Sequence, residues 1–298
     1  MSIQRKFILG EEWLYLKIYA GIGFQDKLLA KEILEITSIL YRDQLIDKFF
    51  FIRYNDQDGS HLRLRFHISD TAHILVIIQL VKEKLKPAII NRSISKISWD
   101  TYVRELERYG TDSIEAVESI FSINSWKVIT SLSTSSNAQE NAWLIAIGLT
   151  DELMNSFNLN QDEKHQLMEI SYQHYFKRFG EGKELKNTLK DRYREKSSQI
   201  REQLNSSQSF DNYHLLSDSL NPSVQSDSTK KIISLHQQKE AGKAELILVI
   251  RSLVHMIFNR TFSYSQNTFE LVIYYMLSNF YKSEAIRVRN KSAEVLIK

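Results

Sequence analysis

Hydrophobic and polar residues alternate in several stretches of the first third of the chain. Residues 11–20 alternate and are rich in aromatic side chains. The runs FFFIRY (residues 49–54) and HLRLRF (residues 61–66) flank the polar segment NDQDGS, and residues 93–103 alternate again. A period of two is typical of β-strands, and two such runs around a polar, glycine-containing segment predict a hairpin. These stretches predict a small, mostly antiparallel sheet.

Apolar residues recur at helical spacing between these strands. Residues 23–44 carry an apolar stripe with a period of three to four residues, which predicts a long helix. Residues 69–87 predict a second helix, which begins at Ser69 and Asp70 as candidate caps and ends at Pro87. We expect both helices to pack against the sheet.

The pattern changes from about residue 112, where successive helical stretches follow one another. Residues 205–228 are polar and rich in turn-forming residues, and they predict a mobile loop or lid. Two further helices are predicted at about 229–261 and 265–282. The expected fold class is therefore α+β, in a single domain over residues 1–298. Its sheet-rich part would span 1–110 and its largely helical part 111–285.

Composition excludes several classes of function. The chain has 298 residues and a net charge of +3, an excess of basic residues too small to indicate nucleic-acid binding. It lacks cysteine, its eight histidines form no pair at i, i+4, and it contains no G-x-G-x-x-G motif. We therefore expect activity with no metal and no nucleotide or other cofactor. The chain shows no signal peptide and no apolar run long enough to span a membrane, so we expect a cytoplasmic protein.

The run HLRLRF contains the first candidate site. In a strand, His61, Arg63, Arg65 and His67 would lie on one face, with apolar residues on the other. This pattern fits a strand with a solvated basic face. It also fits an anion-binding site, because two neighbouring guanidinium groups can hold a carboxylate.

Two later stretches add further candidates. In YVRELERYG (residues 102–110), Glu105 and Arg108 would meet one helical turn apart, either as a local ion pair or as part of a site. In RSLVHMIFNR (residues 251–260), Arg251, His255 and Asn259 are spaced at i, i+4 and i+8. They would form a polar stripe on an otherwise apolar helix. A lone helical histidine is usually structural, but one flanked by Arg and Asn is a better site candidate. We predict that the substrate-binding residues are Arg251, Asn259 and Arg260.

Taken together, these stretches resemble the C-terminal domain of lantibiotic dehydratases, which also occurs as a free-standing chain in split dehydratases and in thiopeptide biosynthesis. The resemblance rests on FFFIRY with HLRLRF, on YVRELERYG leading into DSIEAVESIFSINS, and on SLVHMIFNR. It covers nearly the whole chain, from about residue 10 to 282. The family commonly reads R-Y-G-G, whereas here Gly110 is followed by Thr111.

The resemblance implies a lyase. In full dehydratases a larger N-terminal domain transfers glutamate from glutamyl-tRNA to Ser or Thr of a precursor peptide. The C-terminal domain then eliminates glutamate and leaves dehydroalanine or dehydrobutyrine. The elimination residues fall here on Arg63, Arg65, Glu105, Arg108 and His255. The implied partners are a precursor peptide with leader and core and a separate glutamylating subunit, and a homodimer stays open.

The chemistry of elimination suits these residue types. Removal of the α-proton and departure of a carboxylate develop negative charge, which the arginines would stabilise. A histidine has a pKa suited to proton transfer, whereas arginine stays protonated. Glu105 would orient an arginine. An alternative is a thiopeptide pyridine synthase, which joins two dehydroalanines in a formal 4+2 cycloaddition and expels the leader. A second alternative is a non-catalytic peptide-binding subunit.

Overall fold

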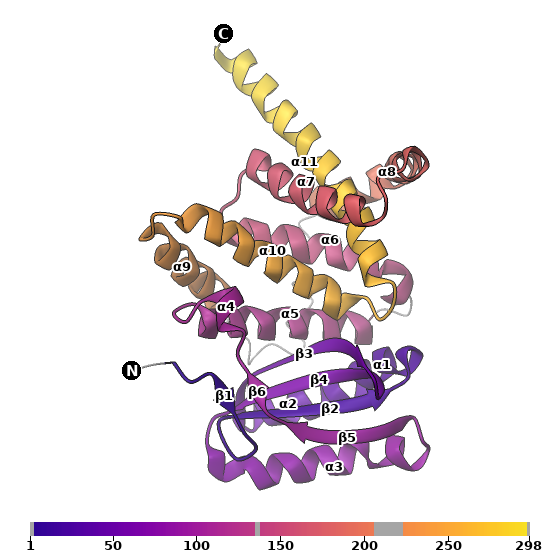
Figure 1. Cartoon of the computed structure of the whole chain (residues 1–298), viewed down its shortest axis with the longest axis vertical. Helices are drawn as coiled ribbons and strands as arrows, with labels where there is room; N and C mark the ends of the chain where they lie inside the picture. The colour runs from indigo at the N-terminus through magenta and orange to yellow at the C-terminus, as the bar shows by residue number, and fades with distance from the viewer. Residues whose placement is uncertain (1–2, 135–137, 206–222, 297–298) are drawn as a thin grey trace. The chain divides into compact units, whose positions relative to one another are not determined.

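The computed structural model describes residues 3–134, 138–205 and 223–296. Its first part alternates strands and helices (Figure 1). In chain order these elements are β1 (Lys6–Phe7), β2 (Trp13–Ala20), α1 (Ile22–Leu28), the π-helical turn η1 (Leu29–Ile33), α2 (Leu34–Arg42), β3 (Ile46–Asp56), β4 (Gly59–Ile68), the 3₁₀ turn η2 (Thr71–His73), α3 (Ile74–Ile90), β5 (Ile94–Asp100), β6 (Tyr102–Val103) and α4 (Leu106–Tyr109).

The rest of the described chain is helical. These helices are α5 (Ile114–Thr134), α6 (Ala138–Ser156), α7 (Gln161–Arg178), α8 (Lys183–Asn205), α9 (Ser223–Gln237), α10 (Gly242–Thr261) and α11 (Gln266–Leu296). The expected α+β class, with its small antiparallel sheet near the N-terminus, is confirmed.

The main sheet has the strand order β3-β4-β2-β5, and every neighbouring pair is antiparallel. The predicted hairpin is confirmed as β3 and β4, which pair from Ile46↔Ile68 to Asp56↔Gly59. Gly59 closes the turn with a φ of +112°, in the region that favours glycine. The two-residue strands β1 and β6 form a separate pair that the alternation pattern did not predict.

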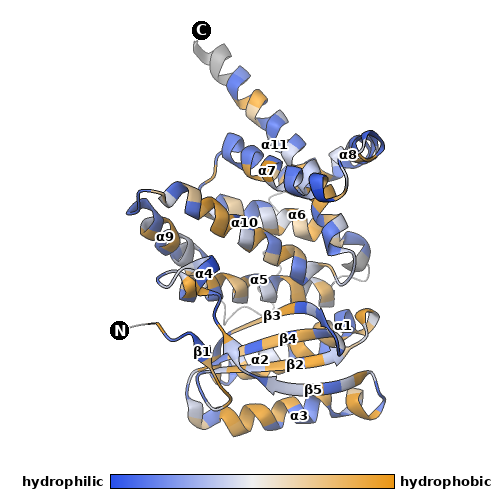
Figure 2. Cartoon of the chain, in the orientation of Figure 1, coloured by the Kyte–Doolittle hydropathy of each residue, from blue (hydrophilic) through white to orange (hydrophobic). Residues whose placement is uncertain are grey.

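The apolar face of the sheet carries the core of this part of the chain. Leu14, Leu16, Leu62 and Leu64 are buried there. The helical run from α1 to α2 contacts strands β3 and β4, and α3 contacts β5. Apolar colouring along these strands and along α3 and α5 matches this packing (Figure 2). The alternation in the sequence thus determines which side of each strand faces the helices.

Strand β3 is an edge strand, and polar side chains of α5 and α10 complete its hydrogen bonds. Three alternate β3 residues donate their amide N–H groups. Phe49 donates to Ser122 Oγ (3.2 Å), Phe51 to Ser125 Oγ (3.2 Å) and Arg53 to Asn259 Oδ1 (3.0 Å). Asn259 Nδ2 donates back to the carbonyl oxygen of Arg53 (3.0 Å). These bonds satisfy buried backbone groups that would otherwise lack partners, and they fix α10 against the sheet.

The chain forms two compact units. The first comprises the described parts of residues 1–140 and 210–264 and holds the sheet, α5, α9 and α10. The second comprises the described parts of residues 141–209 and 265–298, in which α7 packs along α11. Within it, the buried Lys164 pairs with Asp151 at 2.7 Å. All candidate site residues belong to the first unit, and the single domain over the whole chain stays a prediction.

Several boundaries differ from those predicted. Helix α11 continues past residue 282 to Leu296. Helix α3 continues through Pro87 to Ile90, because Pro87 is exposed and water can satisfy the carbonyl that loses its partner. The helix predicted at 229–261 is two helices, α9 and α10, joined at residues 238–241. Residues 223–228 of the predicted loop are helical, and residues 206–222 of that loop lie outside the described residues.

Candidate functional site

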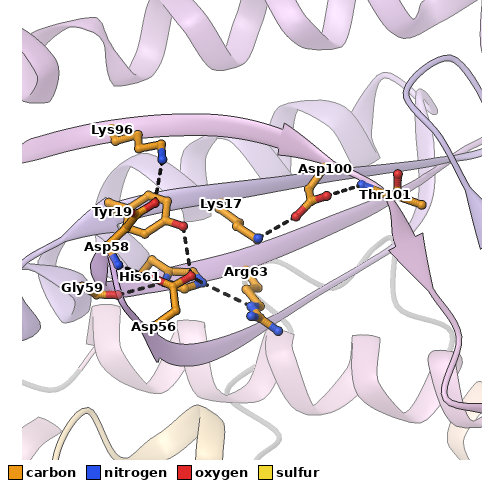
Figure 3. Close-up of polar contacts among 10 residues, drawn as sticks. All are labelled: Lys17, Tyr19, Asp56, Asp58, Gly59, His61, Arg63, Lys96, Asp100 and Thr101. Carbon is orange, nitrogen blue, oxygen red and sulfur yellow. Dashed lines mark hydrogen bonds and ion pairs between the residues drawn. The ribbon is translucent and has the colours of Figure 1, made fainter.

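The face of the sheet opposite the leucines is polar and cationic. The strand register brings β2 residues beside the predicted β4 row, with Tyr15 opposite Arg65 and Lys17 opposite Arg63. Lys17 is neutralised by an ion pair with Asp100 at 2.5 Å. Figure 3 shows that ion pair beside His61 and Arg63 on the same face.

Arg63 is held in place by two neighbours. Its Nε–H donates to His61 Nε2 at 3.2 Å (Figure 3). The guanidinium carbon lies 3.4 Å from the centroid of the Tyr54 ring, in a cation–π contact. Among the described residues no carboxylate forms an ion pair with Arg63. The guanidinium is therefore oriented while its two terminal nitrogens stay available to a ligand.

The hydrogen bonds of His61 indicate which of its nitrogens carries the proton. His61 is fully buried, and its Nδ1 lies 3.1 Å from the carbonyl oxygen of Gly59, which can only accept. Its Nε2 accepts from Arg63, which can only donate. The ring is thus assigned as neutral, with the proton on Nδ1. Burial is the main cause that lowers the pKa of His61.

Arg65 is buried, and among the described residues no carboxylate forms an ion pair with it. Its side chain is 8% exposed, and its guanidinium carbon lies 4.5 Å from the Tyr15 ring centroid and 5.1 Å from those of Phe50 and Tyr102. Its Nε and Nη1 have no hydrogen-bond partner among the described residues. Burial lowers the pKa of Arg65, yet a guanidinium stays cationic at neutral pH. Buried charges are normally paired, so this arginine has the features of an anion-binding residue.

A second buried arginine comes from α10. Arg260 is 0% exposed; its Nε donates to Ser125 Oγ (3.0 Å) and its Nη1 to the carbonyl oxygen of Met256 (2.9 Å). Its Nη2 has no partner among the described residues. Burial lowers the pKa of Arg260, and Tyr109 and Arg65 lie within electrostatic range of it. Arg260 is therefore a second buried cation near Arg65, placed there by α10.

The segment after β6 carries the predicted Glu105–Arg108 pair. Arg108 Nε lies 3.3 Å from Glu105 Oε2, with side chains 48% and 61% exposed. Burial raises the pKa of the neighbouring Tyr109 to about 12, with smaller effects from Glu105, Arg108 and Arg260. Gly110 ends the turn with a φ of +80°, which explains the glycine at this position, and Thr111 follows without a positive φ. We call Arg63, Arg65, Arg108 and Arg260 the arginine cluster: Arg65 lies within electrostatic range of Arg63 and Arg260, and Arg108 and Arg260 both lie within electrostatic range of Tyr109.

Arg251, His255 and Asn259, the predicted polar stripe on α10, differ in their surroundings. Arg251 and His255 are half-buried on the helix that supplies Arg260 to the cluster. Asn259 instead binds the edge of β3 through both atoms of its amide, so its predicted role in substrate binding competes with a structural role. The contact of His255 with substrate stays a prediction.

Sequence reasoning missed the residues around the arginines. Tyr15 and Lys17 on β2 alternate with apolar residues just as the β4 row does, and this was the available signal. Tyr54 and Tyr102 become neighbours of the arginines only through strand pairing and the fold. Within the described part of the chain, no three potential ligands among His, Cys, Asp and Glu converge as a metal site would require. No described helix is long and apolar enough to cross a membrane.

Comparisons with known proteins found one matching family model and several similar proteins. The family model described as lantibiotic biosynthesis dehydratase C-term matches residues 13–281. The nisin biosynthesis protein NisB of Lactococcus lactis subsp. lactis is 35% identical over 147 residues, which is 49% of this chain and 14% of that protein. The chain thus covers a small part of this curated relative.

Two solved structures have the same fold. One is the tRNA-dependent lantibiotic dehydratase MibB from Microbispora sp. 107891, with a TM-score of 0.66, 18% identity and coverage of 94% of this chain and 29% of that one. The other is TbtD, the pyridine synthase from thiomuracin biosynthesis, with a TM-score of 0.57 and 12% identity. That match covers 91% of this chain and 99% of TbtD.

Proposed function

Because the chain belongs to the lantibiotic biosynthesis dehydratase C-terminal family, we propose that it eliminates glutamate from O-glutamylated Ser or Thr of a precursor peptide. The observation that carries this proposal is the buried Arg65, whose guanidinium has free donors and no anionic partner among the described residues. A departing glutamate supplies the carboxylate that such a residue lacks.

The proposed reaction breaks two bonds of the substrate. A base removes the α-proton of the glutamylated residue, and the electron pair forms the new C–C double bond while the Cβ–O bond breaks. Glutamate leaves with a carboxylate, and the peptide retains dehydroalanine or dehydrobutyrine. Negative charge therefore develops at the peptide carbonyl and on the leaving group, and fixed cations near both stabilise the transition state.

The arginine cluster provides cations of different mobility. Arg63 and Arg65 are fixed by aromatic rings, so little reorganisation is required when charge develops. Arg108 is half-exposed and paired with Glu105, and we assign it to the incoming peptide, with Glu105 as the residue that orients it. We assign His255 to proton transfer. Arg251, Asn259 and Arg260 stay proposed contacts of the substrate.

The proposed reaction requires a partner for the preceding step. The substrate is a glutamylated peptide, so a separate tRNA-dependent glutamylating subunit would supply it, and both would work in the cytoplasm. The reaction as written uses no metal and no redox cofactor. Activity that survives extensive dialysis against a chelator is the expected result, whereas restoration by one added metal would contradict it.

The test is the mass of the peptide product. Arg65→Ala, Arg108→Ala and His255→Ala should each slow elimination on the order of 10²–10³-fold, as removal of one positioned group typically does. Each uneliminated site then keeps a glutamyl adduct. Arg42→Ala is the matched control, because Arg42 is exposed and, within the described part of the chain, pairs only with the adjacent Asp43. It should process the peptide as the wild type does.

A second candidate is a pyridine synthase, which the match over nearly the full length of TbtD favours. Cycloaddition of two dehydroalanines releases no carboxylate, so it gives no role to Arg65, which has no carboxylate partner among the described residues. If wild-type protein leaves glutamylated peptide intact and converts a dehydrated peptide to a macrocycle with release of leader, elimination is the wrong assignment. If the protein binds the peptide and changes neither, it is a non-catalytic subunit.

A further inference from the structure

His61 is a buried histidine that is hydrogen-bonded to an arginine of the candidate site. The ring is fully buried, and both its nitrogens lie within hydrogen-bond distance of fixed partners, Gly59 on one side and Arg63 on the other. Arg63 has no carboxylate partner among the described residues, and its Nε is bound to a histidine instead. An arginine bound to an imidazole nitrogen can be released by a single proton.

We propose that His61 is a positioning residue for Arg63: the neutral imidazole accepts the Nε–H of Arg63 and aims the two terminal nitrogens of the guanidinium at the anion of the substrate. This inference rests on the proposed function, because the anion is the glutamyl carboxylate. Tyr54 fixes the plane of the guanidinium, and His61 fixes its rotation in that plane. Together they leave a bidentate pair of donors free.

Protonation of His61 would break this arrangement. An imidazolium carries a hydrogen on Nε2 and cannot accept a bond from Arg63. A competing acceptor is in place, since Asp56 Oδ2 lies 3.8 Å from Nε2 and already accepts from the Tyr19 hydroxyl at 3.1 Å (Figure 3). The charged imidazole would therefore donate its Nε2–H to Asp56 and repel the guanidinium of Arg63.

The surrounding groups set the pH at which this happens. From β2, Lys17 and Tyr19 face the ring; from β3, Tyr54 and Asp56; and from β4, Arg63. Burial lowers the pKa of His61 most, the Gly59 carbonyl and Asp56 oppose this effect, and Arg63 and Lys17 add to it. Because burial lowers the pKa of His61 from its ordinary value, the ring is neutral at neutral pH and gains its proton only as the pH falls further.

Peptide binding measures this effect without interference from proton transfer. In a His255→Ala background, the dissociation constant of a synthetic O-glutamyl peptide should rise on the order of tenfold as the pH falls from about 7.5 through the midpoint of the His61 titration, because one bond to a charged group is lost. His61→Gln places an amide oxygen near the position of Nε2 and cannot be protonated at these values. It should bind with little dependence on pH.

Two further variants complete the series. His61→Leu removes the acceptor and should bind weakly at every pH, whereas His67→Gln should keep the wild-type pH profile. His67 is a matched control because it lies on the same strand and face but pairs with Asp47. A pH profile that is the same in His61→Gln and in the wild type overturns the proposal. If the peptide binds to none of the proteins at any pH, the proposed function fails instead.

A spectroscopic measurement decides the case independently of the substrate. In protein labelled with ¹⁵N-histidine and ¹⁵N-arginine, the His61 ring should show a protonated Nδ1 and an unprotonated Nε2 at pH 7.5. The Nε–H resonance of Arg63, assigned by its absence in Arg63→Lys, should shift with the same midpoint as the His61 ring. A ring protonated on Nε2 at pH 7.5, or an Arg63 resonance that ignores the titration, overturns the proposal.

Discussion

Arg65→Met should separate stability from activity. Methionine keeps most of the apolar length of arginine and removes a charge that is 8% exposed and unpaired among the described residues. If Arg65 only stabilised the fold, its replacement would lower the free energy of unfolding. If Arg65 binds the anion of the substrate, its replacement should lower activity instead, because the folded protein already bears the desolvation penalty of the buried charge.

Opposing contributions determine the size of the stability change. Replacing buried ionic groups by apolar residues is often neutral or stabilises by about 1–4 kcal/mol. Against this, Arg65 loses cation–π contacts with Tyr15, Phe50 and Tyr102, each worth about 0.5–2 kcal/mol. We therefore expect the free energy of unfolding to stay within about 1–2 kcal/mol of wild type. Elimination should fall on the order of 10²–10³-fold, which is about 2.7–4 kcal/mol in the barrier.

Arg104→Met is the matched control. Arg104 is 5% exposed like Arg65, but it binds both carboxylate oxygens of Glu118, at 2.8 and 2.7 Å. Removing it strands a fully buried carboxylate, which costs about 3–5 kcal/mol. Urea unfolding followed by tryptophan fluorescence reports on this unit, because Trp13 and Trp126 are buried in it. If Arg65→Met unfolds as easily as Arg104→Met, Arg65 is structural and the anion site is refuted.

Two further substitutions test the supports of the site by the same unfolding measurement. Gly110→Ala should lose about 1–3 kcal/mol, because φ is +80° and the new Cβ would lie 3.0 Å from Ser113 Oγ; Gly21→Ala, which has no positive φ and nothing within 4 Å, should leave the stability close to wild type. Asn259→Ala should lose about 1–3 kcal/mol by freeing the backbone N–H and carbonyl of Arg53. An Asn259→Ala protein that is fully stable but cannot bind peptide would instead support the predicted substrate contact.

The sequence predicted those parts of the fold that depend on local periodicity. The β3–β4 hairpin followed from a period of two around a polar turn, and the burial of alternate residues matches it. The order β3-β4-β2-β5 could not be read, because it depends on contacts between strands far apart in sequence. The continuation of α3 past Pro87 was missed because the rule for proline assumes a buried or unsolvated carbonyl.

The sequence predicted which residues form the candidate site, but it did not predict which side chains surround each of them. HLRLRF placed Arg63 and Arg65 on one face, and the structure agrees. The run contains the histidine that holds Arg63, since His61 lies two residues before it on β4. The three rings around Arg65 come from β2, β3 and β6, so their positions follow only from strand register and tertiary packing.

Four buried or partly buried arginines of the first unit differ in whether a carboxylate pairs with them. This difference distinguishes arginines that stabilise the fold from those we propose to bind substrate. Arg53 and Arg104 each pair with a carboxylate, at 2.6 and 2.7 Å, and their charges are neutralised within the fold. Arg63 and Arg65 have no such partner among the described residues, although aromatic rings and His61 hold them in fixed positions. Holding an unpaired cation in place gives up stability that a carboxylate would restore. We therefore propose that the lack of a carboxylate partner among the described residues, rather than the presence of arginine, marks where an anionic substrate binds.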